Sequence, residues 1–329
     1  MHEMIEEIHS MVIDLTYRCN AHCQYCQWGS KDSRGADLEL EKILLPKEIL
    51  ESMNINKIVF SGGEPLLHKN FEAIVRYYVE MGMKQLVLIS NGILISKLKL
   101  LELLNLGING ITVSFDSIDE QVANAARGMS ELQHKKVVQN IRMISEYKQN
   151  HNSFEFGINV TLSKVNIEKK SVVNTIAFLN DLNLDFVKFQ PIFNDGYVEN
   201  NAPELLFDKD NSEQILDVGK YITRNLVHRS NPFGFYKTIN YLLKGAVLDG
   251  NTCGIDSNQS IFINDKVKFC YWMDDPTYGK ITDNFSTEYV KSTVKDFLIK
   301  KNLCKTNMYC FCLQKIDHTW RVIKREKSG

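Results

Sequence analysis

Short apolar runs alternate with amphipathic stretches through the first 195 residues of this 329-residue chain. The apolar runs have the length of strands, and the stretches between them repeat apolar residues at helical spacing. The strand-like runs are 11–17, 56–62, 85–90, 110–117, 154–162 and 184–192, and the helical stretches are 69–82, 96–106, 131–149 and 168–183. This order predicts a parallel α/β sheet with right-handed crossovers. Six units fit a partial (β/α)6 TIM-like barrel better than a full eight-unit one.

The pattern changes after residue 195. A polar, turn-rich connection is followed by two helical stretches and a hairpin, at 194–211, 212–228, 235–248 and 260–272, with Asn264-Asp265 at the hairpin turn. We therefore expect a core domain over 1–195 and a small C-terminal α+β domain over 196–329.

Charge and hydropathy exclude several classes of protein. Lys and Arg number 39 against 40 Asp and Glu, so the net charge of -1 gives no general attraction to nucleic acid or to a membrane surface. No apolar run approaches the roughly 18 residues that span a bilayer, and the start MHEMIEEIHS lacks the basic and apolar regions of a signal peptide. A cytoplasmic protein without nucleic-acid or membrane partners is expected.

The eight cysteines fall into two groups, three at 19–26 and five at 253–312. In a reducing cytoplasm, closely spaced cysteines indicate metal ligands or catalytic thiols more often than disulfides. Cys19, Cys23 and Cys26 form a C-x3-C-x2-C motif in the loop after the first strand. Three thiolates leave one iron of a four-iron cluster open to another ligand. A zinc site with His22, or three unrelated thiols, stays open on the spacing alone.

This spacing, with Tyr25 directly before the third cysteine, resembles the radical S-adenosylmethionine (SAM) superfamily motif. The second strand ends in Gly62-Gly63-Glu64-Pro65, which is similar to the family's GGEP motif. The resemblance covers about residues 10–195. It implies that Cys19, Cys23 and Cys26 hold a [4Fe-4S] cluster, that the amino and carboxylate groups of SAM bind the open iron, and that SAM is cleaved to a 5'-deoxyadenosyl radical. Glycines would let the backbone approach the methionine end of SAM, and Glu64 would lie beside its ammonium.

Further matches to the family are looser. Ser90 and Asn91, at the end of the third strand, resemble the ribose-contacting position. The segment VSFDS followed by Arg127-Gly128 resembles the SFD…RG pattern, so Ser114, Asp116 and Arg127 join the expected cofactor site. By this resemblance Arg127 and Ser114 hold the SAM carboxylate, because a guanidinium suits a carboxylate. Gln190, at the end of the sixth strand, would border the adenine.

The C-terminal cysteines resemble the SPASM/Twitch type of auxiliary-cluster domain. They are Cys253, Cys270, Cys304, Cys310 and Cys312. Five cysteines suffice for one four-iron cluster plus one spare thiol, and Cys253 and Cys270 are the strongest candidate ligands. A zinc site is the alternative for the whole group. The spare cysteine is then a free buried thiol or a hydrogen-atom donor.

The resemblance implies a radical SAM oxidoreductase or natural-product-modifying enzyme. It would abstract a hydrogen atom from a small metabolite or short peptide and oxidise it with help from an auxiliary [4Fe-4S] cluster, with electrons from a flavodoxin- or ferredoxin-type donor. Peptide-modifying members of the family often carry a leader-binding domain before the barrel, whereas only about ten residues precede it here. This weakens the hypothesis of a peptide substrate without removing it. A peptide epimerase and a non-catalytic iron–sulfur electron carrier or scaffold are the alternatives. The sequence singles out no catalytic residue and no substrate.

Overall fold

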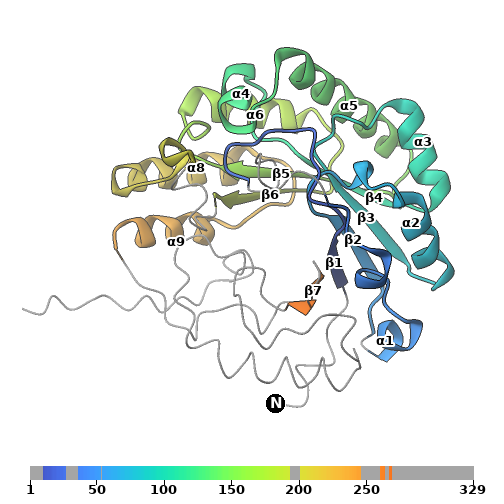
Figure 1. Cartoon of the computed structure of the whole chain (residues 1–329). Helices are drawn as coiled ribbons and strands as arrows, with labels where there is room; N and C mark the ends of the chain where they lie inside the picture. The colour runs from blue at the N-terminus through green and yellow to red at the C-terminus, as the bar shows by residue number, and fades with distance from the viewer. Residues whose placement is uncertain are drawn as a thin grey trace, which may run out of the picture.

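The computed structural model describes residues 10–26, 36–52, 54–192, 201–245, 260–263 and 267–268. Six strands form a curled half-barrel in the order β6-β5-β4-β3-β2-β1, and every neighbouring pair is parallel (Figure 1). The strands are β1 Ser10–Asp14, β2 Lys57–Ser61, β3 Gln85–Ser90, β4 Gly110–Ser114, β5 Glu155–Leu162 and β6 Phe186–Pro191. The predicted partial (β/α)6 barrel is confirmed.

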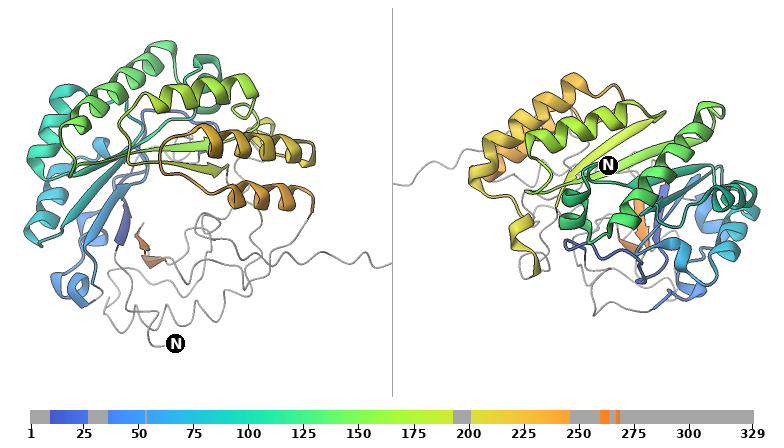
Figure 2. Two further views of the ribbon diagram at one scale, coloured as in Figure 1. Left: turned by 180° about the vertical axis from the view of Figure 1, so that it is seen from behind. Right: turned by 90° about the horizontal axis from the view of Figure 1, so that it is seen from above.

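Helices cover the convex side of this sheet in all three ribbon views (Figures 1 and 2). The α-helices are α1 Lys47–Ser52, α2 Phe71–Glu80, α3 Lys97–Leu106, α4 Glu120–Arg127, α5 Glu131–Gln149, α6 Lys169–Asn180, α8 Ser212–Asn225 and α9 Phe233–Leu243. Short 3-10 helices are η4 Leu40–Lys42, η5 Pro65–Leu67, η6 Pro203–Leu205 and η7 Lys209–Asn211. Within these described elements, none has the length and apolar character of a membrane span.

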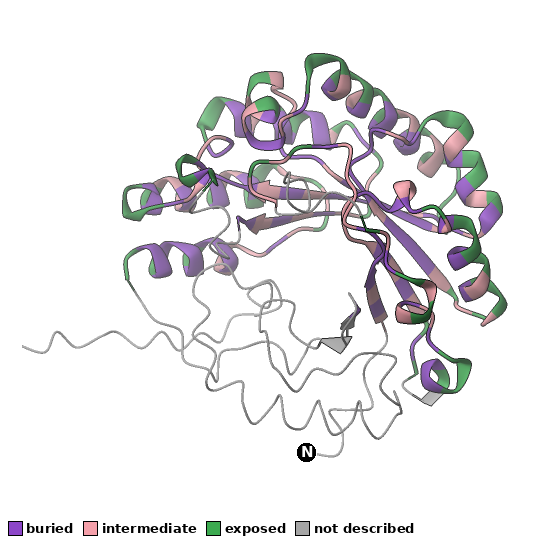
Figure 3. Ribbon diagram, viewed as in Figure 1, coloured by how far each residue is buried: buried purple, intermediate pink, exposed green. Residues whose placement is uncertain are grey.

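The core lies between the strands and the helices. Alternate strand residues such as Phe60, Val113 and Ile158 are buried on the helix-facing side of the sheet. The helices are buried on the side that meets the sheet and exposed on the other (Figure 3). The intervening strand residues face the concave side.

Local signals explain why several helix boundaries could be predicted from the sequence. The Ser96 side chain accepts a hydrogen bond from the Lys99 backbone N–H and begins α3, and Gly107, at a φ of 111°, ends it. Ser130 and Gln133 form a reciprocal capping box at the start of α5. Each device satisfies backbone groups that the end of a helix leaves unpaired.

The structure adds two helices that the sequence pattern did not predict, and it pairs the expected hairpin with the barrel sheet. Helices α1 and α4 are short, and α4 is capped by Asp119. Strand β7 (Ser260–Ile263) pairs in parallel with β1, and β8 (Val267–Lys268) pairs antiparallel with β7. These are the two strands of the expected hairpin, whose turn lies outside the described residues. The barrel sheet thus gains a strand from the segment assigned to a second domain, while the division at residue 195 stays a prediction.

Helices α8 and α9, which confirm the helices expected at 212–228 and 235–248, pack as a pair next to β6. Tyr236 of α9 is fully buried, and its ring centroid lies 6.4 Å from that of Phe189 in β6. Gly219 of α8 makes this approach possible, because a Cβ there would lie 2.3 Å from Cγ of Tyr236.

We predict that Gly219→Ala destabilises the protein, although alanine favours a helix interior by about 1 kcal/mol over glycine. The added methyl group displaces the Tyr236 ring, which we expect to cost about 1–3 kcal/mol through overpacking. Urea unfolding measures the change in the free energy of unfolding. Lys220→Ala is the control, because the ion pair of Lys220 with Asp217 is exposed and its loss should change stability little. A Gly219→Ala protein as stable as wild type would contradict the close packing.

Candidate active site

The three motif cysteines lie in the loop that follows β1, at the carboxyl edge of the sheet. All three are half-buried. The Ala21 backbone N–H lies 3.5 Å from Sγ of Cys19, and the Cys26 N–H donates to the Cys23 carbonyl at 3.1 Å. The N–H of Gln24 donates to the Ala126 carbonyl at 3.1 Å, so helix α4 holds the loop from outside.

The glycine motif is built against this cysteine loop. The N–H of Gly63 donates to the Thr16 carbonyl at 2.7 Å, and the N–H of Glu64 donates to the Arg18 carbonyl at 2.8 Å. A Cβ on Gly63 would lie 2.2 Å from the Arg18 carbonyl oxygen. Gly62 has a φ of 111°, and its Cβ would lie 2.8 Å from the Thr16 oxygen. In this structure both glycines permit the close approach of two loops.

Glu64 joins the second and third strands. Its carboxylate is fully buried and accepts hydrogen bonds from Ser90 Oγ at 3.0 and 3.1 Å and from the Asn91 N–H at 2.9 Å. It also accepts from the Leu66 N–H at 3.4 Å, at the start of η5, where Pro65 is the first residue. Burial raises the pKa of Glu64 to about 7, although these hydrogen bonds oppose the shift.

Asn91 continues the connection to the cysteine loop. Its Nδ2 donates to Asn20 Oδ1 at 2.7 Å and lies 3.7 Å from Cys19 Sγ. Glu64, Ser90 and Asn91, which were matched to the family separately, are therefore parts of one hydrogen-bonded unit. Asn20 was missed in the sequence, where nothing marks it apart from its place between two cysteines.

Tyr25, Asp116 and Arg127 form a second buried unit. Tyr25 donates from its hydroxyl to Asp116 Oδ2 at 2.6 Å, and Arg127 Nη1 donates to the same hydroxyl at 3.1 Å. Arg127 Nη1 lies 3.6 Å from Asp116 Oδ2, with side-chain exposures of 5% and 0%. The other carboxylate oxygen of Asp116 accepts from the Thr161 N–H of β5 at 2.9 Å. The unit thus ties the cysteine loop to β4, β5 and α4.

Arg127 brings a buried positive charge to the cysteines. Burial by itself lowers its pKa, but the neighbouring Cys23, Tyr25 and Asp116 raise it well above the usual value, so the guanidinium stays charged. Burial raises the pKa of the Cys23 thiol, and Arg127 opposes this shift. The Nε of Arg127 is buried and has no hydrogen-bond partner among the described residues. A buried, unpaired N–H beside the cysteines suits an anionic ligand group.

Gly128, which follows Arg127 in the RG pattern, also allows a close contact with the cysteine loop. It ends α4 with a φ of 58°, and a Cβ there would lie 2.5 Å from the His22 carbonyl oxygen. His22 itself is exposed, and its backbone packs on the end of the helix. The pattern therefore combines a buried cation with a glycine that lets the cysteine loop approach it.

Arg18 and Asp37 support the start of the cysteine loop and were not predicted. Arg18 Nε and Nη2 donate to the two oxygens of Asp37 at 3.0 and 2.9 Å, and Nη2 also reaches the Leu67 carbonyl. Asp37 Oδ1 accepts from Thr16 Oγ1 at 2.8 Å. These partners lie about twenty residues apart in the chain, so no local pattern indicates them.

Two of the expected cofactor residues stand apart from these units. Ser114 and Gln190 lie on the concave side of β4 and β6, and no hydrogen bond of the described residues links either side chain to the cysteine loop. The auxiliary-cluster candidates lie outside the described part of the chain, and they are Cys253, Cys270, Cys304, Cys310 and Cys312. Their role stays a prediction.

The described residues fit an iron–sulfur cluster with SAM by their chemistry. The loop supplies three thiols, each of which binds a different iron in a [4Fe-4S] cluster. In the ranges that the structure describes, no group of three His, Cys, Asp or Glu side chains is arranged so that it could bind a single metal ion. The unpaired Arg127 Nε and the buried Glu64 carboxylate match the carboxylate and ammonium of an amino acid.

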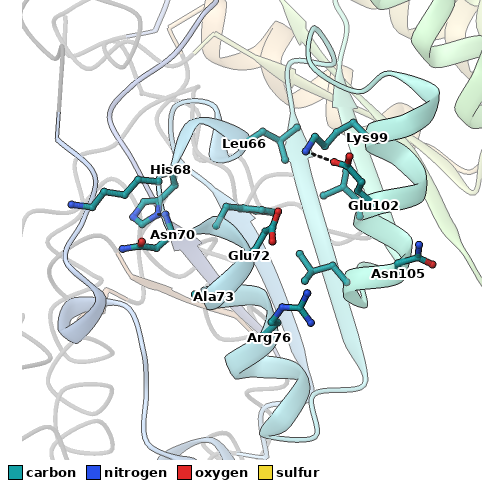
Figure 4. Close-up of a pocket in the computed structure, with 13 residues that line it drawn as sticks. Leu66, His68, Asn70, Glu72, Ala73, Arg76, Lys99, Glu102 and Asn105 are labelled. Carbon is teal, nitrogen blue, oxygen red and sulfur yellow. Dashed lines mark hydrogen bonds and ion pairs between the residues drawn. The ribbon is translucent and has the colours of Figure 1, made fainter.

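A separate cavity of about 690 Å³ lies on the outer side of the barrel, between α2 and α3. Figure 4 shows that its labelled side chains come from η5, from the connection to α2 and from the two helices, and that they carry both signs of charge, including an ion pair between Lys99 and Glu102. None of the three motif cysteines lines it.

The half-barrel and its cysteine loop define an α/β domain of the type that binds a cofactor at the carboxyl ends of parallel strands. Residues 13–171 match the family model described as "Radical SAM superfamily". Over these residues the chain contains a radical SAM domain.

Curated relatives share sequence over part of the chain. A probable GTP 3',8-cyclase of Methanococcus aeolicus is 28% identical over 205 residues, which cover 56% of this chain and 61% of that protein. A PqqA peptide cyclase of Granulibacter bethesdensis is 29% identical over 134 residues, covering 41% of this chain and 36% of that protein. The match thus spans less than two thirds of either relative.

Solved structures confirm the fold. SuiB of Streptococcus suis bound to SAM superposes with a TM-score of 0.62 at 15% identity, covering 85% of this chain and 65% of that chain. The structure titled "Native anSMEcpe with bound AdoMet" superposes with a TM-score of 0.60 at 18% identity, covering 93% of this chain and 84% of that chain.

We predict that Gly63→Ala separates the glycine loop from the cysteine loop and costs about 2 kcal/mol or more, since its Cβ meets a backbone carbonyl that cannot rotate away. The matched control is Gly82→Ala. Gly82 has a φ of 79° but open space around its Cβ position, so we expect only the conformational cost of about 1 kcal/mol. Urea unfolding of both variants tests this, and equal losses would contradict the close contact.

Glu64→Gln tests the buried carboxyl through pH. Burial raises the pKa of Glu64 in the folded protein to about 7, so the protonated carboxyl stabilises the fold. This stabilisation is complete below the unfolded pKa of about 4.3 and is lost as the pH rises toward 7. We expect the wild type to lose up to about 1.4 kcal/mol per pH unit relative to Glu64→Gln in that window. Urea unfolding of both cluster-free proteins at pH 5, 6 and 7 measures it, and parallel curves would refute the shift.

Proposed function

We propose that this chain is a radical SAM enzyme that abstracts a hydrogen atom from a small metabolite or short peptide. The observation that carries the proposal is the junction of the cysteine loop with the Glu64–Ser90–Asn91 unit and the Tyr25–Asp116–Arg127 unit. The match to the family gives the class of cofactor, and this junction supports our choice of the residues that would hold it.

In this proposal Cys19, Cys23 and Cys26 hold a [4Fe-4S] cluster, and one iron stays open for SAM. The cluster and SAM together supply reductive cleavage of SAM to a 5'-deoxyadenosyl radical, which takes the substrate hydrogen. The GTP cyclases, the PqqA peptide cyclase and the SAM-bound structures are similar to this chain and support this class of chemistry.

Glu64 and Arg127 bind the two ends of the amino acid part of SAM. The Glu64 carboxylate accepts a hydrogen bond from the ammonium of SAM. Burial raises the pKa of Glu64, and the approaching cation would favour the ionised carboxylate. Arg127 offers its unpaired Nε to the carboxylate, while Tyr25 and Asp116 hold the rest of its guanidinium in place. Because both groups are buried, their charges act at low dielectric and orient SAM strongly.

Ser90 and Asn91 position Glu64, and we propose that they also border the ribose of SAM. We place Ser114 and Gln190 on the concave wall, where they would contact SAM or the substrate. The auxiliary [4Fe-4S] cluster at the C-terminal cysteines, the flavodoxin- or ferredoxin-type electron donor and the cytoplasmic location are parts of the same proposal. Relatives named as GTP and peptide cyclases support both a small molecule and a peptide as substrate.

Production of 5'-deoxyadenosine tests the proposal. Anaerobically reconstituted protein, given SAM and dithionite, is expected to form 5'-deoxyadenosine, and a Cys19→Ala, Cys23→Ala, Cys26→Ala variant to form none. The control is His22→Ala in the same loop, which a zinc site with His22 as fourth ligand would not tolerate and a cluster would. Activity lost in His22→Ala, or absent from the wild type, would contradict the assignment.

Iron content tests the second cluster in the same proteins. Two four-iron clusters predict about eight irons per chain, and the triple variant should keep about four of them. About four irons in the wild type and none in the variant would remove the auxiliary cluster from the proposal and leave the first cluster standing.

A further inference from the structure

The end of the third strand brings a side-chain amide to the cysteine loop. Asn91 is buried, with 6% of its surface exposed, and its Oδ1 accepts a hydrogen bond from the Ile93 N–H at 3.0 Å. Because a backbone N–H needs an acceptor, this bond fixes which end of the amide is the oxygen and turns Nδ2 toward the loop. Nδ2 donates one hydrogen to Asn20 Oδ1 at 2.7 Å, and it lies 3.7 Å from Cys19 Sγ, within reach of its second hydrogen.

Contacts on both sides hold this amide in place. The backbone N–H of Asn91 donates to Glu64 Oε2 at 2.9 Å. From helix α5, Asn140 Nδ2 donates to the carbonyl of Gly92, the next residue in the turn, at 2.8 Å. Rotating the Asn91 amide away from the sulfur would also break its own bonds to Asn20 and to the Ile93 N–H. The position of Nδ2 beside the cysteine is therefore fixed by the fold.

Cys19 meets N–H donors from two parts of the chain. The Ala21 N–H, 3.5 Å from Sγ, belongs to the cysteine loop itself. The Asn91 donor comes from a residue 72 positions away in the sequence. A thiolate accepts such bonds more strongly than a neutral thiol because it carries a negative charge. Since the amide is buried, the bond forms at low dielectric, where its electrostatic effect on the sulfur is strengthened.

We propose that Asn91 is a redox-tuning residue, whose amide N–H donates to Cys19 Sγ and raises the reduction potential of the [4Fe-4S] cluster. Reduction adds one electron from the external donor, with no bond broken and no proton transferred, and it increases the negative charge on the cluster and its thiolate sulfurs. An N–H donor therefore stabilises the reduced state more than the oxidised state. This inference rests on the proposed function, because it requires Cys19 to bind the cluster.

A redox titration of the reconstituted protein without SAM, followed by electron paramagnetic resonance of the reduced cluster, tests the inference. Asn91→Leu keeps the approximate shape of the side chain and removes the donor. We expect its potential to be more negative, so that the ratio of reduced to oxidised cluster at a fixed solution potential falls about three- to tenfold, the worth of one hydrogen bond. Asn91→Asp keeps an acceptor for the Ile93 N–H and replaces the donor by an oxygen, so its ratio should fall at least as far.

The matched control is Asn140→Leu. Asn140 is also buried, and its amide bonds the same turn through a carbonyl rather than through a sulfur. The substitution therefore loosens the turn after β3 and should leave the potential as in the wild type. A potential in Asn91→Leu equal to that of the wild type, or a shift in Asn140→Leu as large as that in Asn91→Leu, would overturn the inference.

A second measurement decides the case in which neither Asn91 variant binds iron. Asparagine labelled with ¹⁵N at its side-chain amide is incorporated into Asn20→Asp, which keeps an oxygen to accept from Asn91 and removes the other labelled amide of this pair. We expect electron spin echo modulation from ¹⁵N in the reduced cluster, and its absence would overturn the inference. The iron content and 5'-deoxyadenosine formation of the wild type test the proposed function separately: with both present, an unchanged potential refutes only the role of Asn91.

Discussion

Two backbone hydrogen bonds between the cysteine loop and the glycine loop hold the site together. They run from Gly63 to Thr16 and from Glu64 to Arg18, at 2.7 and 2.8 Å. They form only because Gly63 lacks a Cβ, which would otherwise lie 2.2 Å from a carbonyl oxygen. The contact fixes where the thiols lie relative to Glu64, and through Glu64 relative to the third strand.

Buried charge organises the other half of the site. Asp116 and Arg127 are almost fully removed from solvent, and such a pair costs free energy unless its hydrogen bonds are complete. Tyr25 and the Thr161 N–H complete those of Asp116, whereas the Nε–H of Arg127 has no partner in the part of the chain that the structure describes. The protein thus maintains a desolvated cation beside Cys23, in the place where an anionic cofactor group would complete it.

The sequence predicted the parts of the fold and site that depend on local pattern. Hydrophobic periodicity placed β3 and α5, and the spacing of the cysteines and of the GGEP residues placed both loops at the carboxyl edge. The family resemblance also selected Tyr25 in the cysteine motif and Asp116 with Arg127 in the SFD…RG pattern, but as two separate matches. Their contact joins residues 91 and 102 positions apart, and only the folded sheet brings them together.

Other features had no local signal at all. The pairing of β7 with β1 joins strands from opposite ends of the chain, so periodicity could identify the strand but not its neighbour. The glycines were expected to approach SAM, yet in the described structure they first serve contact between loops.

We propose that the cysteine loop, Glu64 and Arg127 form one site, in which the amino acid end of SAM would meet the open iron. Electron–nuclear double resonance of the reduced cluster, with SAM labelled with ¹⁵N at its amino group, tests this contact directly. We expect a ¹⁵N hyperfine coupling to the cluster in the wild type and a weakened or lost coupling in Glu64→Ala. A reduced cluster with SAM bound to the protein and no ¹⁵N coupling would contradict it.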